Sequence, residues 1–216
     1  MKMKKVSLIL SAVVMTAMML SSCGGGASKE VTIDKQVWMT QNLNVDKFRN
    51  GDPIPEAKTD EEWKKAGENG EPAWCYYNNN TDNGDRYGKL YNWYAVNDPR
   101  GLAPEGWKIP SDEDWSRLTD FLGGEAGTKM KYTDFWADND GESGNGTNES
   151  GFSGLPGGYR YSSGTFVVIG KDGYWWSSTE HDTGSAWTRN LDCKNGDVSR
   201  YGNDKHSGFS VRCLRD

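Results

Sequence analysis

The chain has 216 residues, a formal net charge of −6 and a mean hydropathy of −0.82. Removal of residues 1–22, which hold three lysines and no acidic residue, lowers the formal charge from −6 to −9. This acidic balance argues against nucleic acid and against anionic lipid headgroups as partners. The chain nevertheless has 10 Trp, 10 Tyr, 6 Phe and 27 Gly. Disordered chains are poor in aromatic residues, so this composition predicts a loop-rich domain whose small core is built from large rings.

An export signal is predicted at residues 1–22. A basic segment with three lysines precedes an apolar run at 6–20, which is too short to span a bilayer core of about 30 Å comfortably. Residues 20–23 read Leu-Ser-Ser-Cys, which resembles the lipobox of bacterial lipoproteins. The resemblance implies that Cys23 carries the lipid and becomes the first mature residue. The alternative is an ordinary signal peptide with a cysteine at this position by chance.

This signal predicts a protein of the cell envelope, anchored to a membrane through the lipid at Cys23. Acyl chains contribute about 0.8 kcal/mol per buried CH₂, so two or more of them anchor a protein stably. The glycine-rich segment 23–30 is expected to be a flexible tether. A glycine at 24 favours the outer membrane, because an aspartate there would favour retention in the inner membrane. The Lys-Glu pair at 29–30 is compatible with export to the cell surface. Residues 31–216 fit one domain by length.

Local signals predict the elements in the first half of this domain. Alternating apolar and polar residues predict two hairpin strands at 31–34 and 36–39. Thr59 and Glu62 form a capping box that predicts the start of a short helix. Turn-forming residues predict long loops in three segments of the chain, at 42–55, 78–85 and 138–151.

Two further helices are expected before a terminal sheet. Apolar residues with helical spacing predict a helix over 88–97. A second helix begins at the capping box of Ser111 and Asp114 and ends at Gly123. Six strands are predicted after it, at 158–161, 165–169, 174–177, 186–192, 197–200 and 208–214. The order predicts an α+β fold, with two helices and a twisted antiparallel sheet. Trp175 and Trp176 are neighbours in a predicted strand, so one should be in the core and at most one exposed.

Three cysteines follow Cys23, namely Cys75, Cys193 and Cys213. In an oxidising compartment the simplest arrangement is one disulfide and one free thiol, and the sequence alone leaves all three pairings open. No Cys-x-x-Cys spacing occurs and the chain has only two histidines. These two facts argue against a structural zinc site.

An oxygen-rich stretch at 138–142 suggests a metal ion, because carboxylate and amide oxygens suit calcium, and the loop at 78–85 is similar in composition. Aligning its glycine with the sixth position of an EF-hand loop puts Trp136 where the first ligand should be, so the match is incomplete. A solvated loop is the alternative, and we expect no cofactor beyond a possible calcium ion. His181 and His206 lie in polar segments without a nucleophile motif such as G-x-S-x-G, so the sequence does not indicate an enzyme.

Five motifs in the domain point to a known family. They are YGKLYNWYAV at 87–96, APEGWKIPS at 103–111, GFSGLPGGYR at 151–160, YWWSST at 174–179 and GFSVRCL at 208–214. In this order they resemble the Fibrobacter succinogenes major paralogous domain, over nearly all of 31–216. The resemblance implies an exported, often lipid-anchored protein with a C-type-lectin-like fold. That fold is shared with formylglycine-generating enzymes and with phage receptor-binding proteins. The family has no well-established activity.

The resemblance also implies a disulfide and a binding region. Cysteines recur in the family at the positions of Cys75 and Cys213, which implies that these two are bridged. Relatives of this fold that bind targets use the terminal sheet and its loops, here 186–207. Strand alternation predicts that Trp187, Arg189 and Leu191 face the core while the residues between them face water. The expected ligand-binding residues are Thr188, Asn190, Asp192, Tyr201, Asn203, Asp204 and His206.

An aromatic platform with amide and carboxylate groups suits a sugar, through stacking and directed hydrogen bonds. We therefore expect a lipid-anchored protein that binds an extracellular glycan or another surface protein. A solvated hairpin without a ligand is the alternative at this site. The second candidate function is a structural or assembly subunit of a surface complex. The third is an enzyme of the formylglycine-generating type, with Cys193 and Cys213 as the cysteine pair by count.

Overall fold

The structure is a computed structural model that describes residues 29–216. The predicted signal peptide, the lipid site at Cys23 and most of the predicted tether lie outside the described residues. Within 29–216, no helix is long and apolar enough to cross a membrane. The first strand begins at Glu30, one residue before the strand that the sequence predicts.

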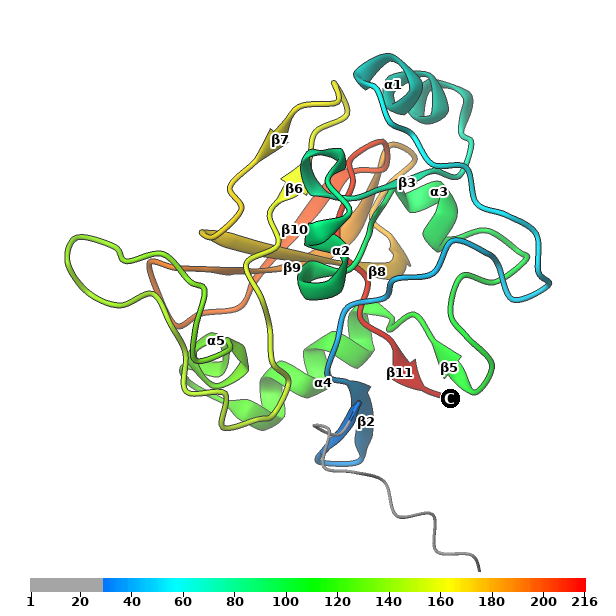
Figure 1. The fold of residues 1–216 in the computed structure, drawn as a ribbon. Helices are drawn as coiled ribbons and strands as arrows, with labels where there is room; N and C mark the ends of the chain where they lie inside the picture. Colours follow the sequence, from blue (N-terminus) through cyan, green and yellow to red (C-terminus); the bar gives the residue numbers. More distant parts are fainter. Residues whose placement is uncertain (1–28) are drawn as a thin grey trace, which may run out of the picture.

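A four-stranded antiparallel sheet joins the two ends of the domain. Its strand order is β1-β2-β11-β5. Strands β1 and β2 form the predicted hairpin, with Asp34 at a φ of 53° in the turn. The last strand, β11, pairs with β2 and β5, so the C-terminus lies beside the first hairpin (Figure 1). The strands are β1 (Glu30–Ile33), β2 (Gln36–Met39), β5 (Trp107–Lys108) and β11 (Leu214–Arg215).

Both capping boxes predicted from the sequence are present. Helix α1 (Asp60–Asn69) is capped by Thr59, whose side chain accepts a hydrogen bond from the Glu62 amide. Helix α4 (Asp112–Leu122) is capped by Ser111 in the same way. These signals are local, since a capping box needs only two residues three positions apart, and so the sequence alone was sufficient for them.

The predicted helix over 88–97 is wrong in its first half. Residues there form strand β4 (Leu90–Tyr91), which pairs with β3 (Trp74–Cys75), and only then helix α3 (Trp93–Val96). Asn92 starts the helix, because its side chain accepts hydrogen bonds from the amides of Ala95 and Ala73. The expected loop at 78–85 is also partly helical. The short helices are η1 (Tyr77–Asn79), α2 (Asp82–Tyr87) and α5 (Ala126–Met130).

A three-stranded antiparallel sheet of order β10-β9-β8 forms the centre of the domain (Figure 1). A small hairpin of β6 and β7 lies beside it, linked through the bridge from Gly158 to Gly173. The predicted strand 208–214 is a strand only at its end. Its earlier part makes isolated bridges to β4, β6 and β8. The strands are β6 (Tyr159–Arg160), β7 (Phe166–Val167), β8 (Asp172–Glu180), β9 (Ser185–Asp192) and β10 (Ser199–Asp204).

The core consists of three clusters of buried residues, dominated by aromatic rings. Trp175 and Trp176 are both buried, which agrees with the prediction that at most one of them is exposed. They point to opposite faces of β8, as neighbours in a strand must. Trp175 packs in a cluster with Trp38 and Trp115, and Trp176 packs against Phe209. The central sheet is therefore covered on both sides, and the fold is a mixed α+β domain.

The implied disulfide between Cys75 and Cys213 is not formed. Cys75, Cys193 and Cys213 are all free and buried. Each of them belongs to a different one of the three core clusters. Burial raises the pKa of Cys75 to about 12 and that of Cys213 to about 12, so both remain protonated thiols.

Candidate functional site

The polar row predicted to face water on strand β9 is mostly buried. Thr188 is fully buried and Asn190 is nearly so. Thr188 donates to the Tyr201 carbonyl at 3.2 Å and accepts from the Asn203 amide at 2.7 Å. Asn190 donates to the carbonyls of Gly173 and Leu191. The exposure prediction is therefore wrong for both, because β9 is the central strand of a sheet that is covered on both faces.

The other predicted polar residues hold turns. The Asp192 carboxylate accepts hydrogen bonds from the amides of Lys194 and Asn195 in the turn after β9. Asp204 accepts from the amide of His206 at 2.9 Å. The His206 ring packs against Tyr94, with ring centres 5.8 Å apart. Of the predicted ligand-binding residues, Tyr201 is the large ring that stays exposed, with half of its surface accessible.

Tyr201 belongs to a larger tyrosine surface that the structure assembles. Tyr161 is 46% exposed, and its ring centre lies 4.8 Å from that of Tyr159. Tyr159 in turn lies 5.0 Å from Tyr174, which is half-buried. Burial raises the pKa of Tyr174, and the nearby Asp172, Tyr201 and Tyr161 raise it further. We call this surface the tyrosine face, defined by Tyr159, Tyr161, Tyr174, Tyr201 and Asp172.

The register of the sheet explains why these residues meet. Tyr174 pairs with Asn190, and Thr188 pairs with Tyr201. Directly paired residues of antiparallel strands share a face, so Tyr174 and Tyr201 point to the same side of the sheet. Tyr159 reaches this side from β6. The face thus combines three strands that lie far apart in the sequence.

Asp172 is the one carboxylate that defines the tyrosine face. It is half-buried, and within residues 29–216 its side chain makes no hydrogen bond or ion pair. Burial raises its pKa and the neighbouring Asp192 raises it further, while the charges of Lys194 and Lys171 oppose this shift without cancelling it. A partly desolvated carboxylate without a donor is unfavourable in the free protein. Such a group is stabilised by a ligand that brings hydrogen-bond donors.

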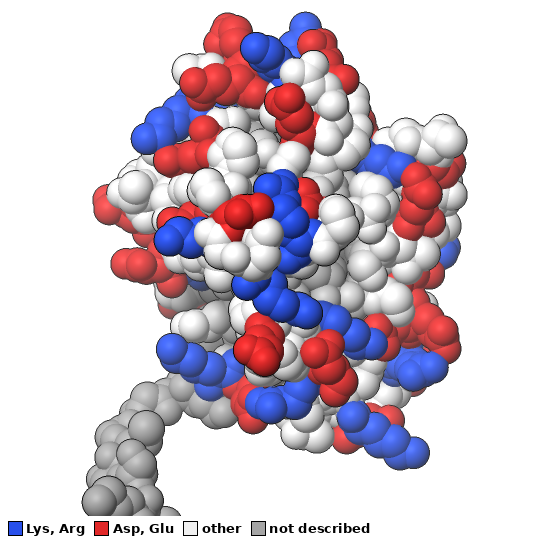
Figure 2. All heavy atoms as spheres, turned by 90° about the vertical axis from the view of Figure 1, so that its right-hand side faces the viewer, with Lys and Arg blue, Asp and Glu red and all other residues white. Residues whose placement is uncertain are grey.

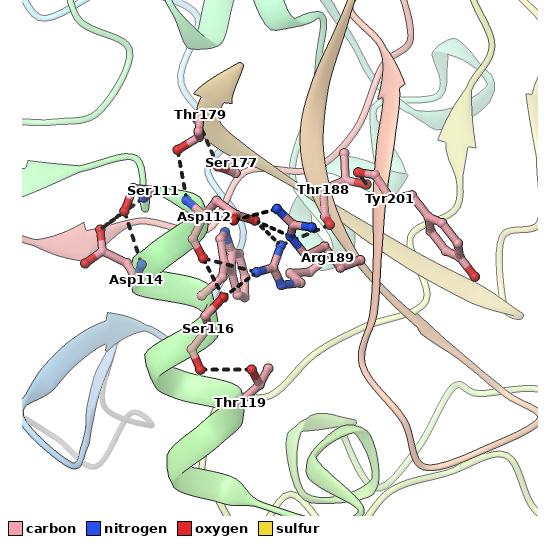
Figure 3. A network of polar contacts seen from close by, with 12 residues as sticks. Ser111, Asp112, Asp114, Ser116, Thr119, Ser177, Thr179, Thr188, Arg189 and Tyr201 are labelled. Atoms are coloured by element: carbon pink, nitrogen blue, oxygen red, sulfur yellow. Dashed lines mark hydrogen bonds and ion pairs between the residues drawn. The ribbon is translucent and has the colours of Figure 1, made fainter. Parts of the chain in front are cut away.

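The opposite side of the sheet is fastened to helix α4. Arg189 donates to Asp112 at 2.7 Å, and Arg200 donates to the same carboxylate at 2.9 Å. Arg189 also donates to the Ser116 hydroxyl at 3.1 Å. Figure 3 shows Arg189 directed towards α4, while the Tyr201 ring points away on the other side of the strands. This network makes the sheet a rigid support for the tyrosine face.

The prediction that Arg189 and Leu191 face the core is confirmed, since both are buried. Trp187 is half-buried, and the Arg200 guanidinium covers its ring at 3.2 Å.

The described part of the chain holds no group of three or more His, Cys, Asp and Glu side chains placed to bind a metal ion. The side of the molecule in Figure 2 carries both acidic and basic side chains.

Sequence reasoning missed Tyr159, Tyr161, Tyr174 and Asp172. One signal for two of them was available, because Tyr159 and Tyr161 are two positions apart, as residues on one face of a strand are. Their proximity to Tyr201 depends on the pairing of β8 with β9 and β9 with β10. No local pattern contains that information.

The fold and this surface define a class of protein: a compact α+β domain that presents an aromatic surface from a rigid central sheet. The Fibrobacter succinogenes major domain family model matches residues 31–215, and the chain belongs to this family. A comparison with curated proteins gave no match.

Proposed function

We propose that this protein is a lipid-anchored binding protein of the cell envelope that recognises a glycan through the tyrosine face. The anchor at Cys23 and a place in the outer membrane, with the domain exposed to the cell surface, rest on the signal sequence. We also propose that the architecture is C-type-lectin-like, on the strength of the sequence motifs. The mixed α+β fold with its short antiparallel sheets is compatible with that proposal.

The observation that carries the proposal is the unpaired carboxylate of Asp172 next to exposed tyrosine rings. Sugar rings present apolar faces that stack on aromatic side chains and hydroxyl groups that donate to carboxylates. Tyr161 and Tyr201 supply exposed rings, and Asp172 supplies the acceptor. Asn203 lies half-buried on β10, two residues from Tyr201, and adds an amide. This combination favours a glycan over a surface protein as the ligand.

The buried thiols weigh against the formylglycine-generating alternative. That chemistry needs a pair of cysteines, and the thiolate is the reactive form. Cys193 and Cys213 belong to separate core clusters, and burial raises the pKa of Cys213 to about 12. A purely structural role as a packed spacer does not account for a carboxylate at Asp172 that lacks a hydrogen-bond donor and lies beside exposed rings.

The test is binding of the full-length protein, held in detergent micelles, to a panel of neutral oligosaccharides by isothermal titration calorimetry. Tyr201→Ala and Tyr161→Ala should each weaken binding about tenfold, as for a central aromatic contact. Asp172→Asn should also weaken binding, yet keep or slightly raise the melting temperature, because it removes a partly desolvated charge.

The matched control is Phe121→Ala. Phe121 is 58% exposed on helix α4, so this substitution removes an exposed ring that lies outside the tyrosine face. It should leave saccharide binding unchanged. The proposal is wrong if no saccharide binds, or if the two tyrosine variants bind as well as the control. Saturable capture of an envelope protein by the same face, with no saccharide bound, would identify the surface-protein alternative instead.

A further inference from the structure

A groove of about 890 Å³ lies on another part of the surface, beside the first strand. Its volume falls in the range usual for ligand sites. It is bounded by β1, helix α2 and the two loops that follow α5. None of the residues of the tyrosine face lines it. The groove is lined in the main by Arg86, Tyr87, Tyr132, Phe135, Ser153 and Leu155, with Asp82 and Asp85 at its side.

Two exposed rings form a stacking surface in the groove. Tyr132 and Phe135 are 36% and 37% exposed, their ring centres lie 6.1 Å apart, and their planes differ by only 8°. The Arg86 guanidinium lies 4.2 Å from the centre of the Phe135 ring. Arg86 makes no hydrogen bond or ion pair within residues 29–216, so its N–H groups remain available to a ligand.

Phe135 is held in a strained conformation that keeps its ring outside the core. Its φ is +75°, a value that bulky residues rarely adopt. The next residue, Trp136, is buried, and its indole donates to the Gly154 carbonyl at 3.2 Å. Ser153, which also lines the groove, has a φ of +57°. Backbone strain of this kind concentrates at functional sites, where the rest of the structure maintains it.

The charges in the groove restrict the ligand. Asp82 and Asp85 are exposed, and their carboxylates make no hydrogen bond or ion pair within the described residues. Glu30 adds a third carboxylate, which pairs with Arg215. Arg86 is the single cation among the lining residues. An acidic ligand would therefore be repelled, whereas hydroxyl or amine donors would find acceptors.

We propose that this groove is a second, independent binding site, which takes an oligosaccharide without acidic groups, neutral or amine-bearing. One sugar ring stacks on Tyr132 and Phe135. Its hydroxyl or amine groups donate to Asp82 and Asp85, and Arg86 donates to ring or hydroxyl oxygens. With a separate site on the tyrosine face, one anchored domain would hold two glycan chains at once. The groove site does not depend on the tyrosine face, and each is tested by its own variants.

The sharpest test uses the strain at Phe135. Asparagine tolerates positive φ better than phenylalanine does, so Phe135→Asn removes the ring while relaxing the backbone. The variant should keep or raise the melting temperature and bind neutral tetrasaccharides at the groove at least about tenfold more weakly. Tyr132→Ala should weaken binding in the same way. Phe121→Ala is again the control that removes an exposed ring elsewhere.

Saccharide binding at the groove is measured separately from binding at the tyrosine face by isothermal titration calorimetry on the full-length protein and its variants. In a Tyr201→Ala background, the binding that remains should be abolished by Phe135→Asn. Neutral oligosaccharides and chitosan oligomers should bind, and oligogalacturonate should not. The groove site is overturned if Phe135→Asn and Tyr132→Ala leave every saccharide isotherm unchanged. Preferred binding of oligogalacturonate would overturn the proposed ligand class. Loss of binding through Tyr201→Ala alone would support the tyrosine face and contradict the groove.

Discussion

The guanidinium of Arg189 and the carboxylate of Asp112 lie 2.7 Å apart, and this pair fastens helix α4 to strand β9. The Arg189 side chain is only 3% exposed. Removal of the carboxylate would leave a buried charge without its partner, which is far more costly than the loss of a surface ion pair. We expect Asp112→Asn to lower the free energy of unfolding by about 3–5 kcal/mol, measured by urea denaturation.

The control for this prediction is Asp120→Asn on the same helix. Asp120 is exposed, and its side chain makes no hydrogen bond or ion pair within residues 29–216. Its substitution should change the unfolding free energy by less than about 0.5 kcal/mol. Equal urea midpoints for the two variants would show that the Arg189 network does not stabilise the fold.

Within residues 29–216, four carboxyl groups have a lowered pKa in the fold, and the three that are partly buried dominate the pH dependence of stability. Hydrogen bonds from Arg100 hold the pKa of Asp98 below its usual range. For Asp112 and Asp114, burial opposes ionisation, but hydrogen bonds from Arg200 and Arg189, and from Ser111 and Lys108, lower the pKa overall. A pKa lowered by folding stabilises the protein above the ordinary value of about 4, and this stability is lost as pH falls through the folded value.

We therefore expect the melting temperature to hold between pH 7 and pH 5 and to fall steeply below about pH 4. Asp172 changes stability with pH in the opposite direction, because its raised pKa favours the protonated form in the folded state. Its effect is smaller than the combined effect of the three partly buried carboxyl groups. The Asp112→Asn variant should show a shallower decline, since one of the three groups is missing. A melting temperature that does not change down to pH 2.5 would contradict this account. Differential scanning calorimetry provides the measurement.

The three buried cysteines should be free thiols in the folded protein. Reducing agent should leave the melting temperature unchanged, and native alkylation should label none of Cys75, Cys193 and Cys213. After denaturation all three should react, as mass spectrometry would show. A Cys75–Cys213 peptide in a non-reducing digest would instead support the pairing implied by the family resemblance.

Lipid attachment is tested by Cys23→Ser. The substitution should leave the protein unprocessed or soluble, because it removes the thiol that we propose as the lipid attachment site. Cys75→Ser is the matched control, since it removes a thiol within the folded domain and should still be processed and partition into detergent. A Cys23→Ser protein that enters the detergent phase with the normal processed mass would refute the anchor.

Local sequence signals and tertiary contacts contributed differently to what could be predicted. Thr59 and Ser111 predict where their helices begin, because a capping box is formed within four consecutive residues of the chain. The helix predicted over 88–97 fails because β4 gains a partner in β3, which a spacing pattern does not contain. Alternation along β9 separated Arg189 from Thr188 correctly as opposite faces. It did not reveal that both faces are covered, which is why Thr188 is buried.

The sequence by itself determined the family, the mixed α+β class and the two capped helices, because each is encoded in local stretches of the chain. Tertiary structure alone decided which residues form a surface. Tyr161, Asp172 and Tyr201 come from separate segments and meet only through strand pairing. Phe135 is exposed, whereas the next residue, Trp136, is buried in the core. Tertiary packing determines which polar and aromatic side chains remain exposed to solvent, and this packing depends on residues that are distant in the chain.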